Sequence, residues 1–232
     1  MRGESNFNIP EFSEDEQKWL EHIYFFDNDF GTNEELRKSV RDRAVNPDNF
    51  LGEGGIGRVV DLGSDVCIKF MLNRANSENK HLYNLGCSPK EEVEFMHKLK
   101  DFLSEGVHSP NVAAYYVGNE GAAIIMEKIN GLNLQFILLG KESLPEGFNI
   151  DNFFERLDGY LQDMHSEFGI AHGDIYARNI MIDIETGNPV LIDFGRSMYL
   201  KGDDPTKDRN SDLDLSMLED VYDKVAKFIE KA

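Results

Sequence analysis

Two short segments in the second half of the chain carry side chains that could take part in chemistry. HGDIYARN (172–179) contains Asp174 and Asn179, and VLIDFG (190–195) contains Asp193. Asn179 and Asp193 flank one predicted β-hairpin, whose size is suited to bringing its two ends together. A few hard oxygen ligands that leave room for phosphate groups suit Mg²⁺, and Asp174 would stay available to orient a hydroxyl. Taken alone, each segment could equally form an ordinary turn.

A glycine-rich segment, LGEGGIGRVV (51–60), lies earlier in the chain. Gly52, Gly54 and Gly57 fit the pattern G-x-G-x-x-G. Because glycine lacks a Cβ atom, such a backbone can bend closely over a phosphate, although a glycine-rich hairpin turn explains the pattern as well. A strand, not a helix, is expected after the glycines, which disfavours a dinucleotide-binding fold. No G-K-[ST] follows, so the segment is not a Walker loop.

Lys69 stands in an otherwise apolar run, VCIKF (66–70). An ammonium group in such a strand is costly to bury unless it is paired, although a strand edge or solvent face would also accommodate it. Glu92 is the preferred partner, because the apolar residues at offsets 3, 4 and 7 place it on the core-facing side of a helix. Glu91 and Glu94 are expected to face water. The apolar residues that share the face of Glu92 are Phe95, Met96 and Leu99.

The elements that position these residues follow from hydrophobic periodicity and from cap and turn signals. A glycine-rich β-hairpin is expected over 50–72, with a pair of strands at 112–118 and 122–129 and a last hairpin over 179–195. Helices are expected at 13–26, 31–45, 88–106, 149–169 and 211–231. We therefore predict an α+β fold with a helical extension (1–48), a small β-rich domain (49–128) and a helical domain (129–232).

Composition excludes several classes of protein. The 232 residues include 43 acidic and 24 basic side chains, a net charge of −19, which argues against nucleic-acid binding and against adsorption to an anionic membrane. Cys67 and Cys87 lack the spacing of a zinc site. Neither a membrane span nor a cleavable signal peptide is expected. We expect a cytoplasmic protein, or a secreted effector that acts in a host cytosol.

Taken together and in order, these segments resemble the protein-kinase-like fold. Four motifs follow the family's order. They are the glycine pattern with Val59, VCIK in place of V-A-I-K, HGD with Asn179 in place of H-R-D with its Asn, and DFG. HSPNV (108–112) is similar to the family's H-P-N-I segment, and IIMEKINGLNL (124–134) to the strand that enters the hinge. The resemblance covers residues 50 to about 200. It implies a bilobal fold with a small β-rich N-lobe and a truncated helical C-lobe.

The resemblance also implies roles in transferring the γ-phosphate of ATP to a hydroxyl. Asp174 would accept or orient the hydroxyl, while Lys69 would hold the α- and β-phosphates and pair with Glu92. The metal ligands would be Asn179 and Asp193, for Mg²⁺ or alternatively Mn²⁺. Arg178, placed as in tyrosine kinases, could screen the γ-phosphate or pair with an acidic neighbour. The nucleotide-binding residues implied in the same way are Gly52, Gly54, Gly55 and Gly57 over the phosphates, Val59, Cys67 and Met181 around the adenine, Met126 as gatekeeper, and Glu127 and Ile129 in the hinge.

The sequence departs from the family's pattern at several positions. Gly173 replaces the Arg that reads a phosphorylated activation loop, which suggests an activity independent of that phosphorylation. Tyr176 stands where serine/threonine kinases carry a Lys. No A-P-E segment follows Gly195, and Asp212 or Asp214 of the last helix would support the catalytic loop. These features resemble compact RIO-type, KEOPS-complex and bacterial effector kinases.

We therefore expect a compact protein kinase that uses Mg·ATP on a protein substrate of unknown identity, with Ser or Thr expected ahead of Tyr. One alternative is an aminoglycoside- or sugar-type phosphotransferase, since that family also uses H-G-D with a downstream Asn. Its members usually lack the full glycine pattern and the DFG glycine. The other alternative is a nucleotide-binding pseudokinase scaffold. Degenerate members commonly lose one of the key residues, and here Lys69, Asp174, Asn179 and Asp193 are all intact.

Overall fold

The structure, a computed structural model, describes residues 23–26, 30–44, 46–53, 57–72, 86–117, 121–200 and 206–231. It divides into two compact units. The first comprises Met1–Arg74 with Ala113–Glu127, and the second comprises Ala75–Val112 with Lys128–Ala232. Each unit buries apolar side chains of its own.

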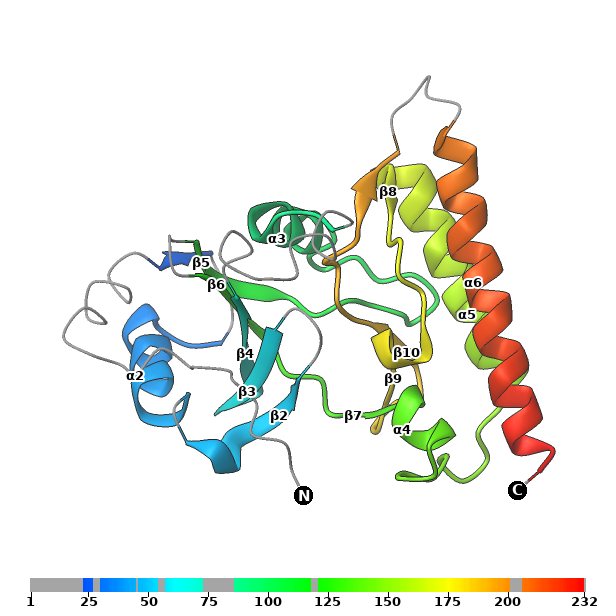
Figure 1. Ribbon diagram of the computed structural model, residues 1–232, viewed down its shortest axis with the longest axis horizontal. Coiled ribbons are helices and arrows are strands. Elements are labelled where there is room, and N and C mark those ends of the chain that lie inside the picture. The colour runs from blue at the N-terminus through cyan, green and yellow to red at the C-terminus, as the bar shows by residue number, and fades with distance from the viewer. Residues whose placement is uncertain are drawn as a thin grey trace. The chain divides into compact units, whose positions relative to one another are not determined.

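The first unit is built on a six-stranded sheet in the order β1-β5-β6-β4-β3-β2 (Figure 1). The pairs β2–β3, β3–β4 and β4–β6 are antiparallel. The turn between β3 and β4 uses Ser64 and Asp65, both at positive φ. The predicted glycine-rich hairpin and the predicted strand pair are thus confirmed. The strands are β1 (Tyr24–Phe25), β2 (Phe50–Glu53), β3 (Gly57–Gly63), β4 (Val66–Leu72), β5 (Val112–Val117) and β6 (Gly121–Glu127).

Helix α2 (Asn33–Arg43) packs on this sheet. A capping box starts it: the Thr32 side chain accepts from Glu35 N, and the Glu35 carboxylate accepts from Thr32 N at 2.7 Å. Leu36 and Val40, one turn apart on the same face, are buried in a cluster with Val60 of β3. The helix predicted over 31–45 is confirmed, and its apolar face covers the sheet. A short 3-10 turn, Pro47–Asn49, connects it to β2.

The helix predicted over 13–26 is wrong at its C-terminal end. Tyr24 and Phe25 form strand β1, which pairs antiparallel with β5. The rings of Tyr24 and Tyr115 stack with their centroids 5.1 Å apart. The edge of β5 supplies backbone partners and an aromatic neighbour, which helical periodicity does not register. Residues 13–22 of the predicted helix lie outside the described residues.

The second unit combines short strands with helices. β10 (Pro189–Leu191), β9 (Ile180–Asp183) and β7 (Gly131–Asn133) form one sheet, and β11 (Met198–Tyr199) pairs with β8 (Ile170–Ala171). The helices are α3 (Pro89–Lys98), α4 (Leu134–Leu138), α5 (Ile150–Asp163), a π-helical turn (Met164–Phe168) and α6 (Thr206–Ile229), with a 3-10 turn at Ala177–Asn179. Figure 1 shows α5 and α6 side by side. The helix predicted over 149–169 and the hairpin over 179–195 are confirmed, while the last helix begins earlier than 211.

Helix α3 is shorter than predicted. Ser88 caps its first turn as expected, but the helix ends at residue 98 instead of 106. Asp101 has a φ of 59°, a left-handed conformation that a continuing helix excludes and that Asp tolerates better than most residues. Leu103, within the segment predicted to be helical, is 66% exposed. The helix keeps the part of the segment that carries Glu92.

The predicted boundaries of the three domains stay predictions. Helix α3 falls within the predicted 49–128 domain, yet it belongs to the same compact unit as Lys128–Ala232. Within the described residues, no helix is both long enough and apolar enough to cross a membrane.

Candidate active site

A buried carboxylate of α6 holds the loop that follows β8. Asp214 is fully buried; its Oδ2 accepts from His172 N at 2.7 Å, and its Oδ1 accepts from Gly173 N at 2.8 Å. Of the two supports predicted for this loop, Asp214 is the one in contact with it, whereas Asp212 is exposed. The buried residues that follow Asp214 at helical spacing and anchor α6 are Leu218, Val221 and Val225.

His172 joins the loop to the segment after β10. Its Nε2 lies 3.2 Å from Ile192 O, and its Nδ1 accepts from Asp174 N at 3.3 Å. Burial lowers the pKa of His172, and this effect exceeds the opposing influence of Asp214. The ring is therefore neutral, with Nε2–H donating to the carbonyl and Nδ1 accepting. His172 thus braces the loop through these contacts, and Phe194 packs edge-on against it at 4.8 Å between centroids.

The two oxygens of the Asp174 carboxylate differ: one is held in place, and the other accepts no hydrogen bond within the described part of the chain. Oδ2 accepts from Arg178 Nη2 at 2.7 Å and from Asn179 Nδ2 at 2.8 Å. Oδ1 is buried and accepts no hydrogen bond from the described residues, although Arg196 Nε lies 3.7 Å away. A buried acceptor without a donor calls for an explanation, and a substrate hydroxyl would supply the missing hydrogen bond.

Asp193 adopts a backbone conformation that is unusual for a residue other than glycine. Its φ is 66°, and its Oδ1 accepts from Gly195 N at 3.4 Å. A Cβ atom at Gly195 would lie 3.2 Å from Asp193 Oδ1 and 3.4 Å from Glu92 Oε2. A larger residue at this position would therefore crowd two carboxylates. Strain of this kind is typical of functional sites.

Glu92 lies where the helical pattern predicted. It is 2% exposed, whereas Glu91 and Glu94 are exposed. The segment that leads into α3 is tied to the same region, because Cys87 N donates to Gly195 O at 3.0 Å. Lys69 is buried in β4 of the first unit, so its predicted pairing with Glu92 stays a prediction.

The glycines of the predicted phosphate loop differ in their surroundings. A Cβ atom at Gly57 would lie 2.2 Å from Phe70 O of β4, so this glycine is required for strand packing. A Cβ atom at Gly52 would meet no atom within 4 Å, so packing against the described residues does not explain this glycine. Gly54 and Gly55 lie outside the described residues.

The predicted adenine and hinge residues of the first unit lie on neighbouring strands. Cys67 of β4 is opposite Met126 of β6, and Cys67 Sγ donates to Glu127 O at 3.6 Å. Val59 lies on β3, the other neighbour of β4. The remaining two, Ile129 and Met181, belong to the second unit, where Met181 lies in β9 and both are half-buried. Contact of these residues with a nucleotide stays a prediction.

Asn179 and Asp193 have the donor chemistry of an open site for a hard cation. The amide nitrogen of Asn179 donates to Asp174. The amide oxygen, on the other arm of the planar group, is thus available to a cation. Mg²⁺ or Mn²⁺ bound by two protein oxygens keeps its other positions for water and phosphate oxygens. Among the described residues, no group of three or more His, Cys, Asp and Glu could hold a metal. An Asn–Asp pair is not a group of that kind.

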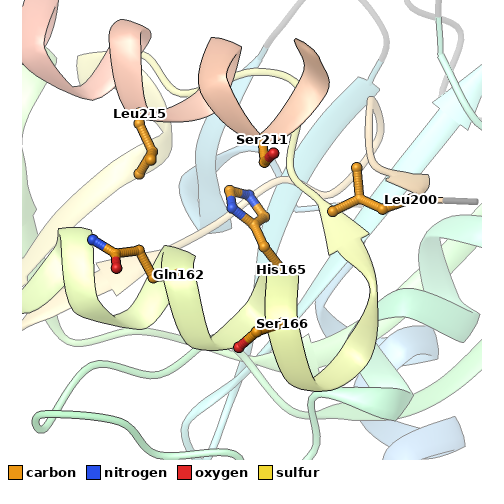
Figure 2. A pocket seen from close by; sticks show the side chains of 6 residues that line it. All are labelled: Gln162, His165, Ser166, Leu200, Ser211 and Leu215. Carbon is orange, nitrogen blue, oxygen red and sulfur yellow. The ribbon is translucent and has the colours of Figure 1, made fainter. Parts of the chain in front are cut away.

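His165 is a further residue of this region that the sequence pattern did not reveal. Figure 2 shows it projecting from the π-helical turn toward Ser211 of α6. Its Nε2 lies 3.0 Å from Asp214 Oδ2, so it supports the carboxylate that holds the loop. The sequence did contain one signal for the burial of His165: this polar residue continues, at helical spacing, the apolar stripe of Leu157 and Leu161. The hollow beside it is lined by Gln162, His165, Ser166, Leu200, Ser211 and Leu215.

Gly173 has a steric reason to be glycine. Its φ is 73°, and a Cβ atom there would lie 2.6 Å from Arg196 O. Ser197 Oγ donates to His172 O at 3.3 Å, and β11 then pairs with β8. The segment after DFG thus lies directly against the loop that carries Asp174.

Comparison with known proteins agrees with this fold. Residues 45–214, well over half of the chain, match the family described as the protein kinase domain. A search of curated proteins gave no match. The chain belongs to the protein kinase domain family, which confirms the predicted α+β kinase-like fold. It is a kinase-type phosphotransferase that uses ATP with a divalent metal ion.

Proposed function

We propose that this chain is a protein kinase that transfers the γ-phosphate of ATP to a hydroxyl of a protein substrate, with Ser or Thr preferred to Tyr and Mg²⁺ as the usual ion. The observation that carries the proposal is the carboxylate of Asp174. One oxygen is held by Arg178 and Asn179, and the other is buried and accepts no hydrogen bond from the described residues. This is the arrangement that a group receiving a hydroxyl proton requires.

Four of the predicted site residues would each have a separate role in this transfer. Asp174 Oδ1 would accept the hydrogen bond of the acceptor hydroxyl and then its proton, while its backbone and ring contacts keep the carboxylate in place. Asn179 and Asp193 would hold the metal ion, which when bound neutralises charge on the phosphates. Lys69 would hold the α- and β-phosphates. Positioning and charge stabilisation, without covalent chemistry, would account for the rate.

A transfer assay tests both the substrate class and the metal ligand. The protein is incubated with labelled ATP and Mg²⁺, with generic protein substrates in one arm and with sugars and aminoglycosides in the other. We expect label on protein hydroxyls, and we expect Asp193→Ala to lower the rate by roughly 10²-fold or more, because metal stabilisation of phosphate charge is worth several kcal/mol.

Asp220→Ala is the matched control, since Asp220 is exposed on α6. Label that appears only on small molecules would contradict the proposal and would indicate an aminoglycoside- or sugar-type phosphotransferase. Nucleotide binding without any transfer would favour a pseudokinase scaffold. A near-normal rate for Asp193→Ala would show that Asp193 is not a ligand of the metal ion.

Activity is expected not to depend on phosphorylation of the segment after DFG. Gly173 carries no side chain that could read a phosphate, and Arg196 O, the Ser197 hydroxyl and β11 already lie against the loop. Treating the protein with a phosphatase, with mass spectrometry to confirm that phosphate is gone, should leave kcat unchanged. Loss of activity that rephosphorylation restores would contradict this part of the proposal.

A further inference from the structure

Two half-exposed arginines flank the carboxylate of Asp174. Arg178 Nη2 lies 2.7 Å from Asp174 Oδ2, and Arg196 Nε lies 3.7 Å from Asp174 Oδ1. The Arg178 side chain is 51% exposed and that of Arg196 is 42% exposed, whereas Asp174 is 8% exposed. One buried negative charge thus has a guanidinium nitrogen within 4 Å of each of its two oxygens, and about half of each arginine side chain is exposed.

The positions of both arginines are held by their surroundings. The backbone of Arg178 accepts a hydrogen bond from Asn133 Nδ2 at 2.8 Å, and its guanidinium stacks on Tyr176 at 4.5 Å from the ring centroid. Arg196 lies in a tight turn in which Ser197 N donates to Phe194 O at 3.0 Å. Ordering these long side chains on substrate binding therefore costs less entropy than ordering free surface arginines.

The chemistry of a guanidinium shows what this pair would recognise. Each guanidinium has five N–H donors in a planar fork, and about half of each side chain is open to solvent. Contact with Asp174 engages only one edge of each fork. The open edges match the oxygens of a carboxylate or a phosphate, which an arginine can bind with two parallel hydrogen bonds.

We propose that Arg178 and Arg196 form an anion-binding pair that selects acceptor segments with a carboxylate or phosphate group close to the hydroxyl. Both guanidinium groups touch the carboxylate that would receive the hydroxyl proton. An extended chain advances about 3.3–3.6 Å per residue, so the anionic group would lie within about two residues of the acceptor. This inference rests on the proposed protein kinase function and names the class of protein segment on which it acts.

The net charge of −19 appears at first to oppose an acidic substrate. Charges farther apart than about 8 Å are largely screened at physiological ionic strength, so the distant acidic surface has a weak influence at the acceptor. The two arginines are in direct contact range and are not screened in this way. The local pair is therefore expected to determine preference next to the hydroxyl.

The test compares peptides that differ only in the residues beside the acceptor. One set has a Ser acceptor flanked by Glu, a second by phosphoserine, a third by Gln, and a fourth by Lys; parallel sets carry Thr or Tyr as the acceptor. The wild-type protein is expected to use the Glu or phosphoserine peptides with a kcat/KM about tenfold above that of the Gln peptides, since hydrogen bonds between charged groups are about twice as strong as those between neutral groups. Moving the Glu more than about two residues away should remove the advantage.

Variants assign this preference to the two arginines. Arg196→Gln is expected to lower the ratio of acidic to neutral kcat/KM to about threefold or less, through KM of the acidic peptide and not through KM of ATP. Arg196→Lys should retain part of the ratio, because it keeps the charge but loses the fork. Arg178→Gln should lower the ratio in the same direction. Arg209→Gln, an exposed arginine of α6, is the matched control and should keep the wild-type ratio.

The outcomes separate this inference from the proposed function. Equal use of Glu and Gln peptides, or a preference for the Lys peptides, overturns the inference and leaves the protein kinase function standing. If Arg196→Gln instead raises KM for ATP or lowers kcat equally for all peptides, the arginines act on the nucleotide, and the inference is again overturned. Transfer to no peptide and no protein overturns the proposed function and the inference together. Preference for phosphoserine over Glu identifies phosphate as the natural anion, and the reverse identifies carboxylates.

Discussion

Replacing Asp174 with asparagine is expected to lower kcat by about 10²- to 10⁴-fold, the range that a positioned acid or base contributes. Asparagine has nearly the same size and keeps one oxygen and the loop geometry, but it cannot take the hydroxyl proton. The change also removes the charge that two half-exposed arginines flank, and solvent already reaches both of those side chains. Steady-state phosphotransfer at saturating ATP and substrate measures the effect.

The control for this prediction is thermal stability together with nucleotide binding. Asp174→Asn should melt close to the wild-type temperature and should bind ATP normally, because the carboxylate contacts the acceptor and not the adenine. Asp220→Asn, on the exposed face of α6, should leave both rate and stability unchanged. If Asp174→Asn retains a rate within about tenfold of wild type, Asp174 is not the proton acceptor.

Replacing Asp214 with asparagine is expected to lower both stability and activity. The buried carboxylate accepts hydrogen bonds from His172 N and Gly173 N and contacts His165 Nε2. An amide offers one oxygen and turns an NH₂ group toward backbone N–H donors, so at least one buried donor loses its partner, at a cost of about 1–3 kcal/mol. For a chain of this size that corresponds to a fall of about 2–12 °C in Tm. The displaced loop should lower kcat by about 10- to 100-fold, since small misplacement of catalytic groups is costly.

Asp212→Asn is the matched control, because it makes the same substitution two residues away on the exposed face of the same helix. It should leave Tm and kcat unchanged. A wild-type Tm and kcat for Asp214→Asn would show that the hydrogen bonds of Asp214 do not hold the loop. His165→Gln offers a second measurement: it should reproduce part of the loss, because it removes a contact to Asp214 Oδ2 and leaves the two backbone donors in place.

Features that depend on neighbouring residues could be predicted from the sequence. The capping residues Thr32 and Ser88 act within a few positions of themselves, so the starts of α2 and α3 were readable. The burial of Glu92, as opposed to Glu91 or Glu94, followed from helical spacing alone. The order of short motifs was sufficient for the class of protein, because a phosphate-handling site needs glycine, lysine and oxygen ligands in a set arrangement.

Features that depend on distant segments could not be predicted in this way. Strand β1 forms because the edge of β5 accepts it, and β7 joins β9 for the same reason, although neither segment has a strong strand pattern of its own. The end of α3 depends on the left-handed conformation of Asp101, which helical periodicity does not encode.

The site shows the same division between local and distant information. Spacing along the chain predicts that Asp174, Asn179 and Asp193 share one site, because a hairpin of that length brings its ends together. The choice of Asp214 over Asp212, the support from His165 and the contact of Arg196 with Asp174 depend on how α6, the π-helical turn and the segment after DFG pack on the loop. A hydrogen bond between residues forty positions apart leaves no periodic signal in the chain, so the partners of the Asp174 loop became apparent from the packed structure and not from the motifs.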